Sequence, residues 1–176
     1  TAIGFSSPVR DGIMRLKYTK LLLNLANAVI ARCGFRGDEA AAELRTAARA
    51  EGIAVLGGAG ISYASEEEDH ARRGDHLTIV PINGVRRTGG STWQSLARGT
   101  GNVEVDWLNG EIVSLGRIHG VPTPVNAVLQ HVANRAARDG IPPESMDAAD
   151  ILAMLLPLRY RSALAPTAIG RFPRTG

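Results

Sequence analysis

The stretch MRLKYTKLLLNLANAVIARCG, residues 14–34, decides how this chain folds. Its apolar residues recur at helical spacing and occupy almost every face of the segment. We therefore predict one helix from about residue 11 to residue 32, with Asp11 as its N-cap and Gly34 as its end. A helix that is apolar nearly all round is usually buried, so we expect this one to lie inside the domain.

The remaining sequence also favours helices, and the predicted fold class is therefore mainly α. Pro122 and Pro124 must separate two of these helices, because proline cannot occupy a helix interior. We expect helices at residues 38–51, 91–99, 103–119, 125–139 and 147–155.

Three segments between the helices are less regular. The stretch GIAVLGGAG, residues 52–60, fits either a short strand that runs into a glycine turn or a connector between helices. The charged residues 63–76 fit a solvated helix or a loop, and residues 76–90 fit a long connector with proline and glycine breakers.

Length and composition indicate one ordinary globular domain. The chain has 176 residues, of which 44% are hydrophobic and 21% are charged. Its single cysteine, Cys33, excludes an internal disulfide and fits a reducing compartment. We predict that Cys33 is a buried or half-buried thiol and takes no part in chemistry.

Charge and hydropathy argue against nucleic acid and membrane as partners. The net charge is +3, much of it in a tail that holds Arg159, Arg161, Arg171 and Arg174, and aromatic residues make up only 5%. A nucleic-acid binder would show a basic stripe with aromatic platforms. The longest apolar stretch, residues 21–30, is too short to span a bilayer. The four histidines lack the spacing of metal ligands, so we predict no metal site.

Lys20, Asn24 and Asn27 form the first candidate site. Their spacing places them on one face of the predicted helix, whose other faces are apolar. They could simply face solvent or bond a neighbouring helix, because a buried polar group needs a partner. They could instead line a polar cleft, in which a partly buried Lys20 would act as a proton donor or bind an anion.

Glu104, Ser91 and Thr92 are the other polar candidates. Glu104 could complement the dipole at a helix start, or it could hold a substrate hydroxyl. Ser91 and Thr92 follow two glycines, where they could cap a helix or help bind an anion. Asp106 and Asn109 lie on other faces, and we expect them to bond backbone or neighbouring helices.

Two segments together resemble a known family. They are MRLKYTKLLLNLANAV, residues 14–29, and GSTWQSLARGTGNVEVDWLNGEIVSLGRIHGVPTPVN, residues 90–126. Both are similar to the C-terminal domain of the 2-dehydropantoate 2-reductase (ketopantoate reductase) family, over about residues 10–140. The resemblance implies a multi-helix domain like the C-terminal domain of 6-phosphogluconate dehydrogenase.

The resemblance also implies a role for each candidate residue. Lys20 would be the general acid that protonates the developing alkoxide when NADPH delivers hydride to a 2-keto acid. Asn24 would support the lysine and bond the substrate, and Glu104 would bind the substrate hydroxyl groups. The substrate carboxylate would be held by Thr92 and the adjacent Ser91. The family often carries an asparagine at the position of Ala28, and Asn27 would substitute for it here.

The same resemblance implies the domain organisation and the partners. Residues 1–9 would lead in from a nucleotide-binding domain, residues 10–156 would form the helical substrate and dimerisation domain, and residues 157–176 would form a flexible tail. No Rossmann domain is expected in this chain, since Gly57, Gly58 and Gly60 do not fit G-x-G-x-x-G. NADPH would then be bound mainly by a Rossmann domain supplied in cis or in trans.

We accordingly expect part of a cytoplasmic, homodimeric reductase that acts on a small 2-keto acid in pantothenate biosynthesis. Alone, the chain should have no reductase activity. The alternative is a non-catalytic helical module, derived from the same fold, that associates through its apolar faces.

Overall fold

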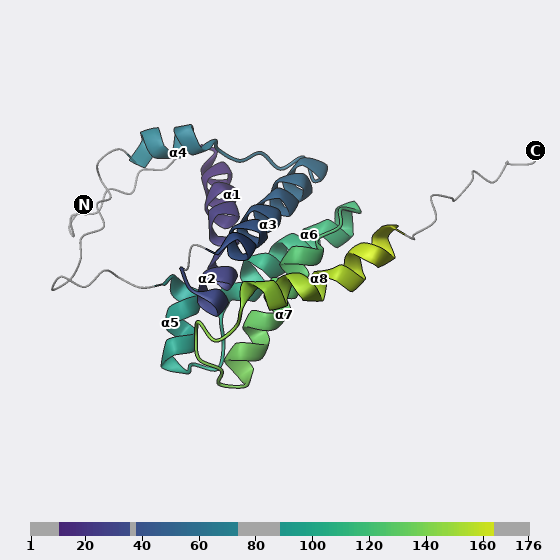
Figure 1. The fold of residues 1–176 in the computed structure, drawn as a ribbon. Helices are drawn as coiled ribbons and strands as arrows, with labels where there is room; N and C mark the ends of the chain where they lie inside the picture. The colour runs from purple at the N-terminus through teal and green to yellow at the C-terminus, as the bar shows by residue number, and fades with distance from the viewer. Residues whose placement is uncertain (1–10, 36–37, 74–88, 164–176) are drawn as a thin grey trace, which may run out of the picture.

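The computed structural model describes residues 11–35, 38–73 and 89–163, and these residues form a helical domain without strands. In chain order the elements are α1 (Ile13–Asn24), α2 (Asn27–Cys33), α3 (Glu39–Gly58), α4 (Glu66–Arg73), α5 (Ser91–Arg98), the 3-10 helix η2 (Glu104–Trp107), α6 (Asn109–His119), α7 (Pro124–Arg138) and α8 (Ala148–Ala163). The prediction of a mainly α fold is confirmed (Figure 1). The predicted lead-in at residues 1–9, most of the connector at residues 76–90 and residues 164–176 lie outside the described ranges.

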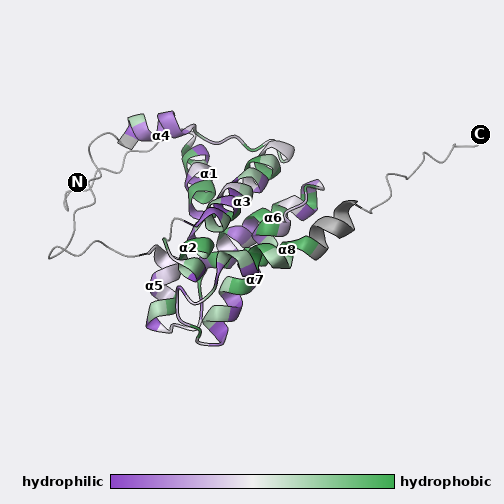
Figure 2. Cartoon of the chain, in the orientation of Figure 1, coloured by the Kyte–Doolittle hydropathy of each residue, from purple (hydrophilic) through white to green (hydrophobic). Residues whose placement is uncertain are grey.

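Helix α7 packs against α2, α3, α6 and α8, and it also contacts α5 and η2. Its apolar face supplies Leu129 and Ala133 to the core, both fully buried. Burial of such side chains is the main source of folding free energy. Figure 2 shows the contrast with α4, which is mostly hydrophilic and lies at the edge of the domain. The largest fully buried apolar side chains are Leu25, Leu44, Leu56, Ile112, Leu129, Ile151 and Leu155.

The predicted helix over residues 11–32 is interrupted, so that prediction is wrong in part. Leu25 and Ala26 keep right-handed helical dihedral angles but separate α1 from α2. At this interruption the carbonyl of Leu25 accepts a hydrogen bond of 3.2 Å from Nδ2 of Asn109, so a distant side chain occupies an acceptor of the helical ladder. The predicted end at Gly34 is confirmed, with φ at 79°. Asp11 is not the N-cap, because the helix starts after Gly12 with no side-chain cap.

A buried polar network joins four of the helical segments. The Glu51 carboxylate of α3 accepts the backbone N–H groups of Val125 and Asn126, at 2.8 and 2.9 Å, where α7 begins. The Asn126 amide donates to the Ala48 carbonyl at 3.0 Å and to Glu51 at 2.8 Å. Its oxygen accepts from Nδ2 of Asn109 at 2.9 Å. Asn109 and Asn126 are fully buried, and these bonds replace much of the water that the two side chains lose on folding, although Oδ1 of Asn109 has no partner among the described residues.

The ambiguous residues 52–60 continue α3 as far as Gly58 and form no strand. From the sequence alone Gly52 is expected to end the helix, whereas in the structure it allows two segments to pack closely. A Cβ atom there would lie 2.7 Å from Leu22 Cδ2 and 2.7 Å from Leu25 Cδ1. Because Gly52 has no side chain, α1 can approach α3 closely at this point.

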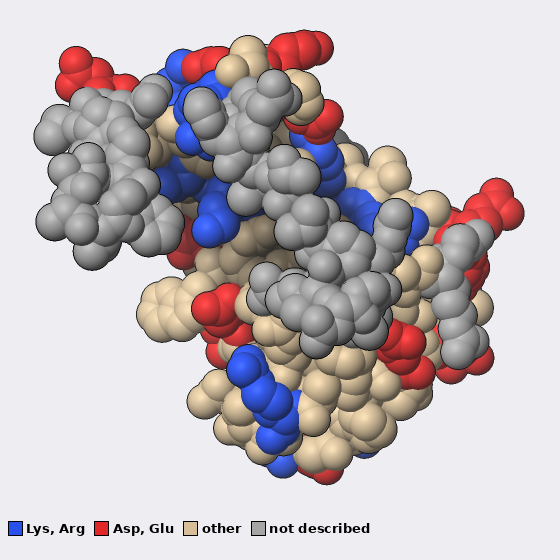
Figure 3. All heavy atoms as spheres, turned by 90° about the vertical axis from the view of Figure 1, so that its left-hand side faces the viewer, with Lys and Arg blue, Asp and Glu red and all other residues tan. Residues whose placement is uncertain are grey.

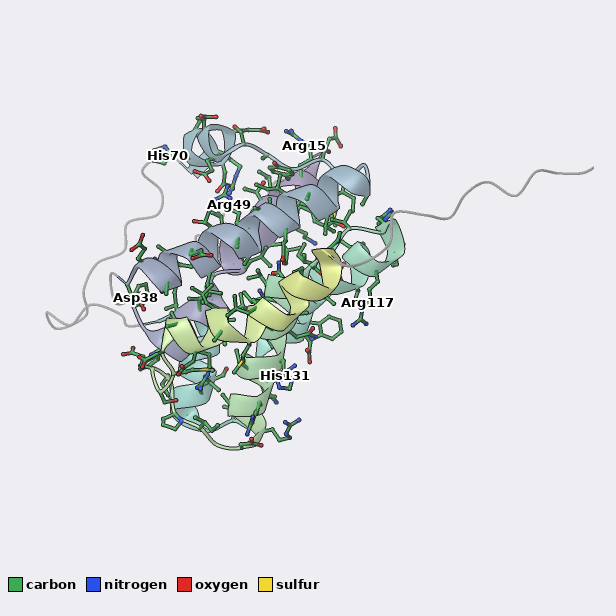
Figure 4. All side chains as sticks on the ribbon, turned by 45° about the vertical axis from the view of Figure 1, so that its right-hand side comes forward. Arg15, Asp38, Arg49, His70, Arg117 and His131 are labelled. Atoms are coloured by element: carbon green, nitrogen blue, oxygen red, sulfur yellow. The ribbon has the colours of Figure 1, made fainter. Side chains whose placement is uncertain are left out.

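Two other predicted boundaries are wrong. The helix expected over residues 103–119 consists of η2 and α6, which are separated at Leu108 with φ at −111° and ψ at −90°. Helix α8 continues to Ala163, beyond the predicted end at Leu155. The charged residues 66–73 do form a helix, α4, and Figure 4 shows Arg15 and Arg49 close to it. Arg15 pairs with Glu68 at 2.8 Å and Arg49 pairs with Glu66, contacts that contribute little where side chains are exposed.

Two glycines of α3 provide a matched test of this packing. We expect Gly52→Ala to lower the free energy of unfolding by about 1–3 kcal/mol, because the added methyl group meets two buried leucines. Gly57→Ala should raise it by up to about 1 kcal/mol, because no atom lies within 4 Å of the added Cβ and alanine favours the helix. Urea denaturation of both variants measures the difference, and equal changes would contradict the packing argument.

Candidate functional site

An open cavity of about 500 Å³ lies between α1, η2 and α6. Lys20 and Asn24 reach it from α1, and Glu104 reaches it from η2. The structure therefore brings together three predicted residues that are about 80 positions apart in the sequence. The apolar part of the wall consists of Met14, Tyr18, Leu21 and Leu108.

The positions of these side chains follow from local structure. Lys20 and Asn24 are one turn apart on α1, so they project toward the same side. Glu104 is the first residue of η2 and follows Val103, which is extended with φ at −142° and ψ at 156°. The sequence predicts Glu104 in the first turn of one long helix, whereas in the structure Glu104 begins the separate short helix η2.

Three polar or aromatic lining residues were not predicted. Lys17 and Glu111 add a second ammonium group and a second carboxylate to the cavity, and Trp107 stands at its edge with 79% of its surface exposed. Lys17 could have been found, because it precedes Lys20 by three residues and so shares its helix face. An exposed tryptophan has no such signal, since aromatic residues are expected to be buried.

The electrostatic character of the cavity is mixed. Lys17 and Lys20 are the only lysines in the sequence, against 18 arginines, and both line this cavity. Figure 3 views the molecule from the side on which α1 and α5 lie and shows basic and acidic side chains close together around a recess. Lys20 is exposed, which agrees with the alternative that it faces solvent and not with the partial burial that the alternative of a cleft proton donor includes.

A second group of predicted residues does not line the cavity of Lys20. It consists of Asn27, Ser91 and Thr92. The side chain of Asn27 packs against Gly90, where a Cβ atom would lie 3.2 Å from Asn27 Oδ1. Ser91 is exposed at the first position of α5, and Gly90 rather than Ser91 or Thr92 occupies the N-cap position.

The first turn of α5 contains a buried hydroxyl group that has no partner among the described residues. Helix N-termini present backbone N–H groups that lack intrahelical partners, and their dipole favours negative charge. Thr92 is 1% exposed, and its Oγ1 has no hydrogen-bond partner among the described residues. The Thr92 hydroxyl and the Asn27 amide, at the start of α5, are groups that can donate hydrogen bonds to a carboxylate.

Neither cysteine nor metal chemistry is indicated in the described residues. Cys33 is buried, as predicted, and burial raises the pKa of its thiol to about 11. No group of three or more His, Cys, Asp or Glu side chains in the described ranges could hold a metal ion. Over the same ranges, no helix has the length and hydrophobicity that crossing a bilayer requires.

The fold and the cavity thus define a helical domain with an open, mixed-charge cleft. The family model described as ketopantoate reductase PanE/ApbA C terminal matches residues 12–137, and this chain belongs to that family. The resemblance and the fold class inferred from the sequence are therefore confirmed.

A solved structure supports the same assignment. The crystal structure of a PanE/ApbA family ketopantoate reductase from Ralstonia eutropha JMP134 matches with a TM-score of 0.62 and 28% sequence identity. The match covers 78% of this chain and 45% of that protein, so this chain spans less than half of its solved relative. No curated protein matches the chain.

The state of Cys33 can be tested with alkylating reagents, since it is the only cysteine. A pKa raised from 9.0 to about 11 lowers the thiolate fraction near pH 8 by roughly 100-fold. Iodoacetamide should therefore label the folded chain far more slowly than the urea-unfolded chain, as measured by mass spectrometry. Equal labelling rates would show that the thiol is accessible and ionised.

The raised pKa of Cys33 also has a consequence for stability. The thiol ionises more readily in the unfolded chain than in the folded chain, so its contribution to stability is full below pH 9.0. This contribution should be lost as the pH rises to about 11. Urea denaturation of the wild-type chain and Cys33→Ala over this range would separate it from other titrating groups.

Proposed function

We propose that this chain supplies the proton donor and substrate-binding groups for NADPH-dependent reduction of 2-dehydropantoate to pantoate, a step of pantothenate biosynthesis. The observation that carries the proposal is the convergence of Lys20, Asn24 and Glu104 on one cavity. Family membership over residues 12–137 supports it independently.

Each side chain has a role that suits its chemistry. The Lys20 ammonium group donates a proton to the alkoxide oxygen that forms at the keto carbon. The Asn24 amide, one turn away, bonds the substrate and orients Lys20. The Glu104 carboxylate accepts hydrogen bonds from the substrate hydroxyl group.

The substrate carboxylate is proposed to bind at the start of α5. The unpartnered Oγ1 of Thr92, the exposed Ser91 and the amide of Asn27 are the groups available there. This places the acid end of the substrate against α5 and the keto group toward Lys20.

The hydride is supplied by NADPH when that cofactor is bound. The described residues form no strand, and therefore no βαβ unit that could hold a dinucleotide. We propose that a Rossmann domain in cis or in trans binds NADPH and covers the cavity, in a cytoplasmic homodimer. The exposed Trp107 and Met14 at the cavity are apolar groups that such a domain would shield from water.

The role of Lys20 is tested in the enzyme completed with its nucleotide-binding domain. Lys20→Ala should lower kcat for ketopantoate by about 10²–10⁴-fold, the usual contribution of a general acid. Lys17→Ala is the matched control, because it removes the other ammonium group of the cavity. It should change kcat by less than about 10-fold and leave the pH profile of kcat unaltered. Equal kcat values for Lys20→Ala and the wild type would refute the assignment.

The role of Glu104 is tested by comparing two substrates. Glu104→Gln should raise KM for ketopantoate by about 10-fold or more, because a hydrogen bond to a charged group is lost. With 2-ketoisovalerate, a 2-keto acid that lacks the hydroxyl group, the variant and the wild type should differ little. Glu111→Gln, the other carboxylate of the cavity, is the control and should not discriminate between the two substrates.

The alternative of a non-catalytic helical module gives different results. The present chain alone should not oxidise NADPH with ketopantoate under either hypothesis. If the chain completed with a Rossmann domain also gave no turnover, and Lys20→Ala did not alter ketopantoate binding, the module hypothesis would replace the enzyme hypothesis.

A further inference from the structure

A buried arginine lies at the end of α2, away from the residues of the proposed reaction. Arg32 is 4% exposed, and its Nη1 donates to the Pro142 carbonyl at 3.2 Å and to Ser145 Oγ at 3.1 Å. Both acceptors are neutral. Among the described residues, no carboxylate pairs with Arg32, and its Nε has no hydrogen-bond partner.

A buried cation without a counter-ion is unusual, because removing the charge from water costs several kcal/mol unless an anion compensates. Burial accordingly lowers the pKa of Arg32 from its ordinary value. The neighbouring loop is also attached to α2 by bonds that do not involve the guanidinium. Backbone bonds from Glu144 to the Ala31 carbonyl, 2.9 Å, and from Met146 to the Arg32 carbonyl, 3.1 Å, already hold it to α2.

Arg32 lines a cavity of about 280 Å³ between α2, α7, α8 and the loop that precedes α8. The polar part of its wall is formed by Arg32, His131, Arg135 and Ser145, and no acidic side chain lines it. Figure 4 shows the labelled His131 on α7, below α8 in that view. Arg135 bonds Asp139 only at 3.4 Å and on the surface, which leaves its charge weakly compensated.

The remaining wall of this cavity is apolar. It is formed by Val132, Ile141, Met146 and Met154. A ligand that fits must therefore combine an anionic group with a short aliphatic body, because phosphate alone would leave the apolar wall without a partner. The cavity shares no lining residue with the cavity of Lys20.

We propose that this second cavity binds a small aliphatic carboxylate. The carboxylate supplies the counter-ion that Arg32 lacks and lies between Arg32, His131 and Arg135. A planar guanidinium suits this group, since it can donate two parallel hydrogen bonds to one carboxylate. The aliphatic body packs against Met146 and Met154, whose unbranched side chains adapt to irregular shapes.

The experiment uses pentanoate as the probe and the present chain, followed by NMR at the Arg32 Nε–Hε group and at the His131 imidazole. We expect saturable shifts at both groups with pentanoate. Pentanol, which has the same body without the charge, and inorganic phosphate, which has the charge without the body, should bind at least about 10-fold more weakly. Absence of saturable shifts with pentanoate, or equal binding of pentanol or phosphate, would overturn the proposal.

Variants separate a binding site from a structural role of Arg32. Arg32→Gln should abolish the binding, but it could also disturb the fold. Arg135 is exposed on α7, so Arg135→Gln should weaken the binding of pentanoate by about 3–10-fold without altering the folded state. Arg138→Gln removes a charge from the same helix outside this cavity and should leave the affinity unchanged. If Arg138→Gln and Arg135→Gln lost the same amount of pentanoate affinity, only general surface charge would be involved, and the proposal would fail.

Discussion

The buried network of Glu51, Asn126 and Asn109 is the constraint on which the arrangement of the helices depends. A carboxylate or amide that loses water without gaining partners is costly, and the Glu51 carboxylate and the side-chain NH2 groups of both asparagines bond to other helical segments. Glu51 on α3 occupies the N-terminus of α7, where N–H groups and the helix dipole favour an anion. Asn109 at the start of α6 reaches the Leu25 carbonyl between α1 and α2. Sliding one helix past another would break several of these bonds at once.

This network also positions the proposed site. Lys20 and Asn24 stand on α1 just before the interruption that Asn109 bonds, and Glu104 stands on η2 just before Asn109 itself. The bond between Asn109 and Leu25 therefore ties the end of α1, which carries Lys20 and Asn24, to the start of α6, which follows Glu104 in the chain. The second group of polar residues begins on the other side of the same interruption, with Asn27 against the start of α5. In an unbroken helix Lys20, Asn24 and Asn27 would all lie on one side.

The sequence predicted most helices because helical spacing is local. The convergence of Lys20, Asn24 and Glu104 was implied by the family resemblance, whereas spacing alone grouped Lys20 and Asn24 with Asn27. The sequence also predicted that Asn109 would bond the backbone of a neighbouring segment, which is confirmed. The break at Leu25 could not be predicted, since Asn109, whose side chain bonds the Leu25 carbonyl, lies 84 positions away in the sequence. The continuation of α3 through Gly52 could not be predicted either, because only tertiary packing shows whether a glycine ends a helix or lets a neighbouring helix approach. The exposure of Lys20 likewise depends on which elements pack around α1, and local spacing carries no information about that packing.

The distribution of lysine gives the chain a chemical asymmetry. Apart from an α-amino group, every primary amine that this sequence encodes opens into a single cavity, while the rest of the basic surface is guanidinium. Amine-selective reagents, such as acetylating agents or short cross-linkers, will therefore modify the candidate active site first. A cross-linker added to the assembled protein would join α1 to whichever surface covers it, so that covalent labelling maps the neighbouring domain directly.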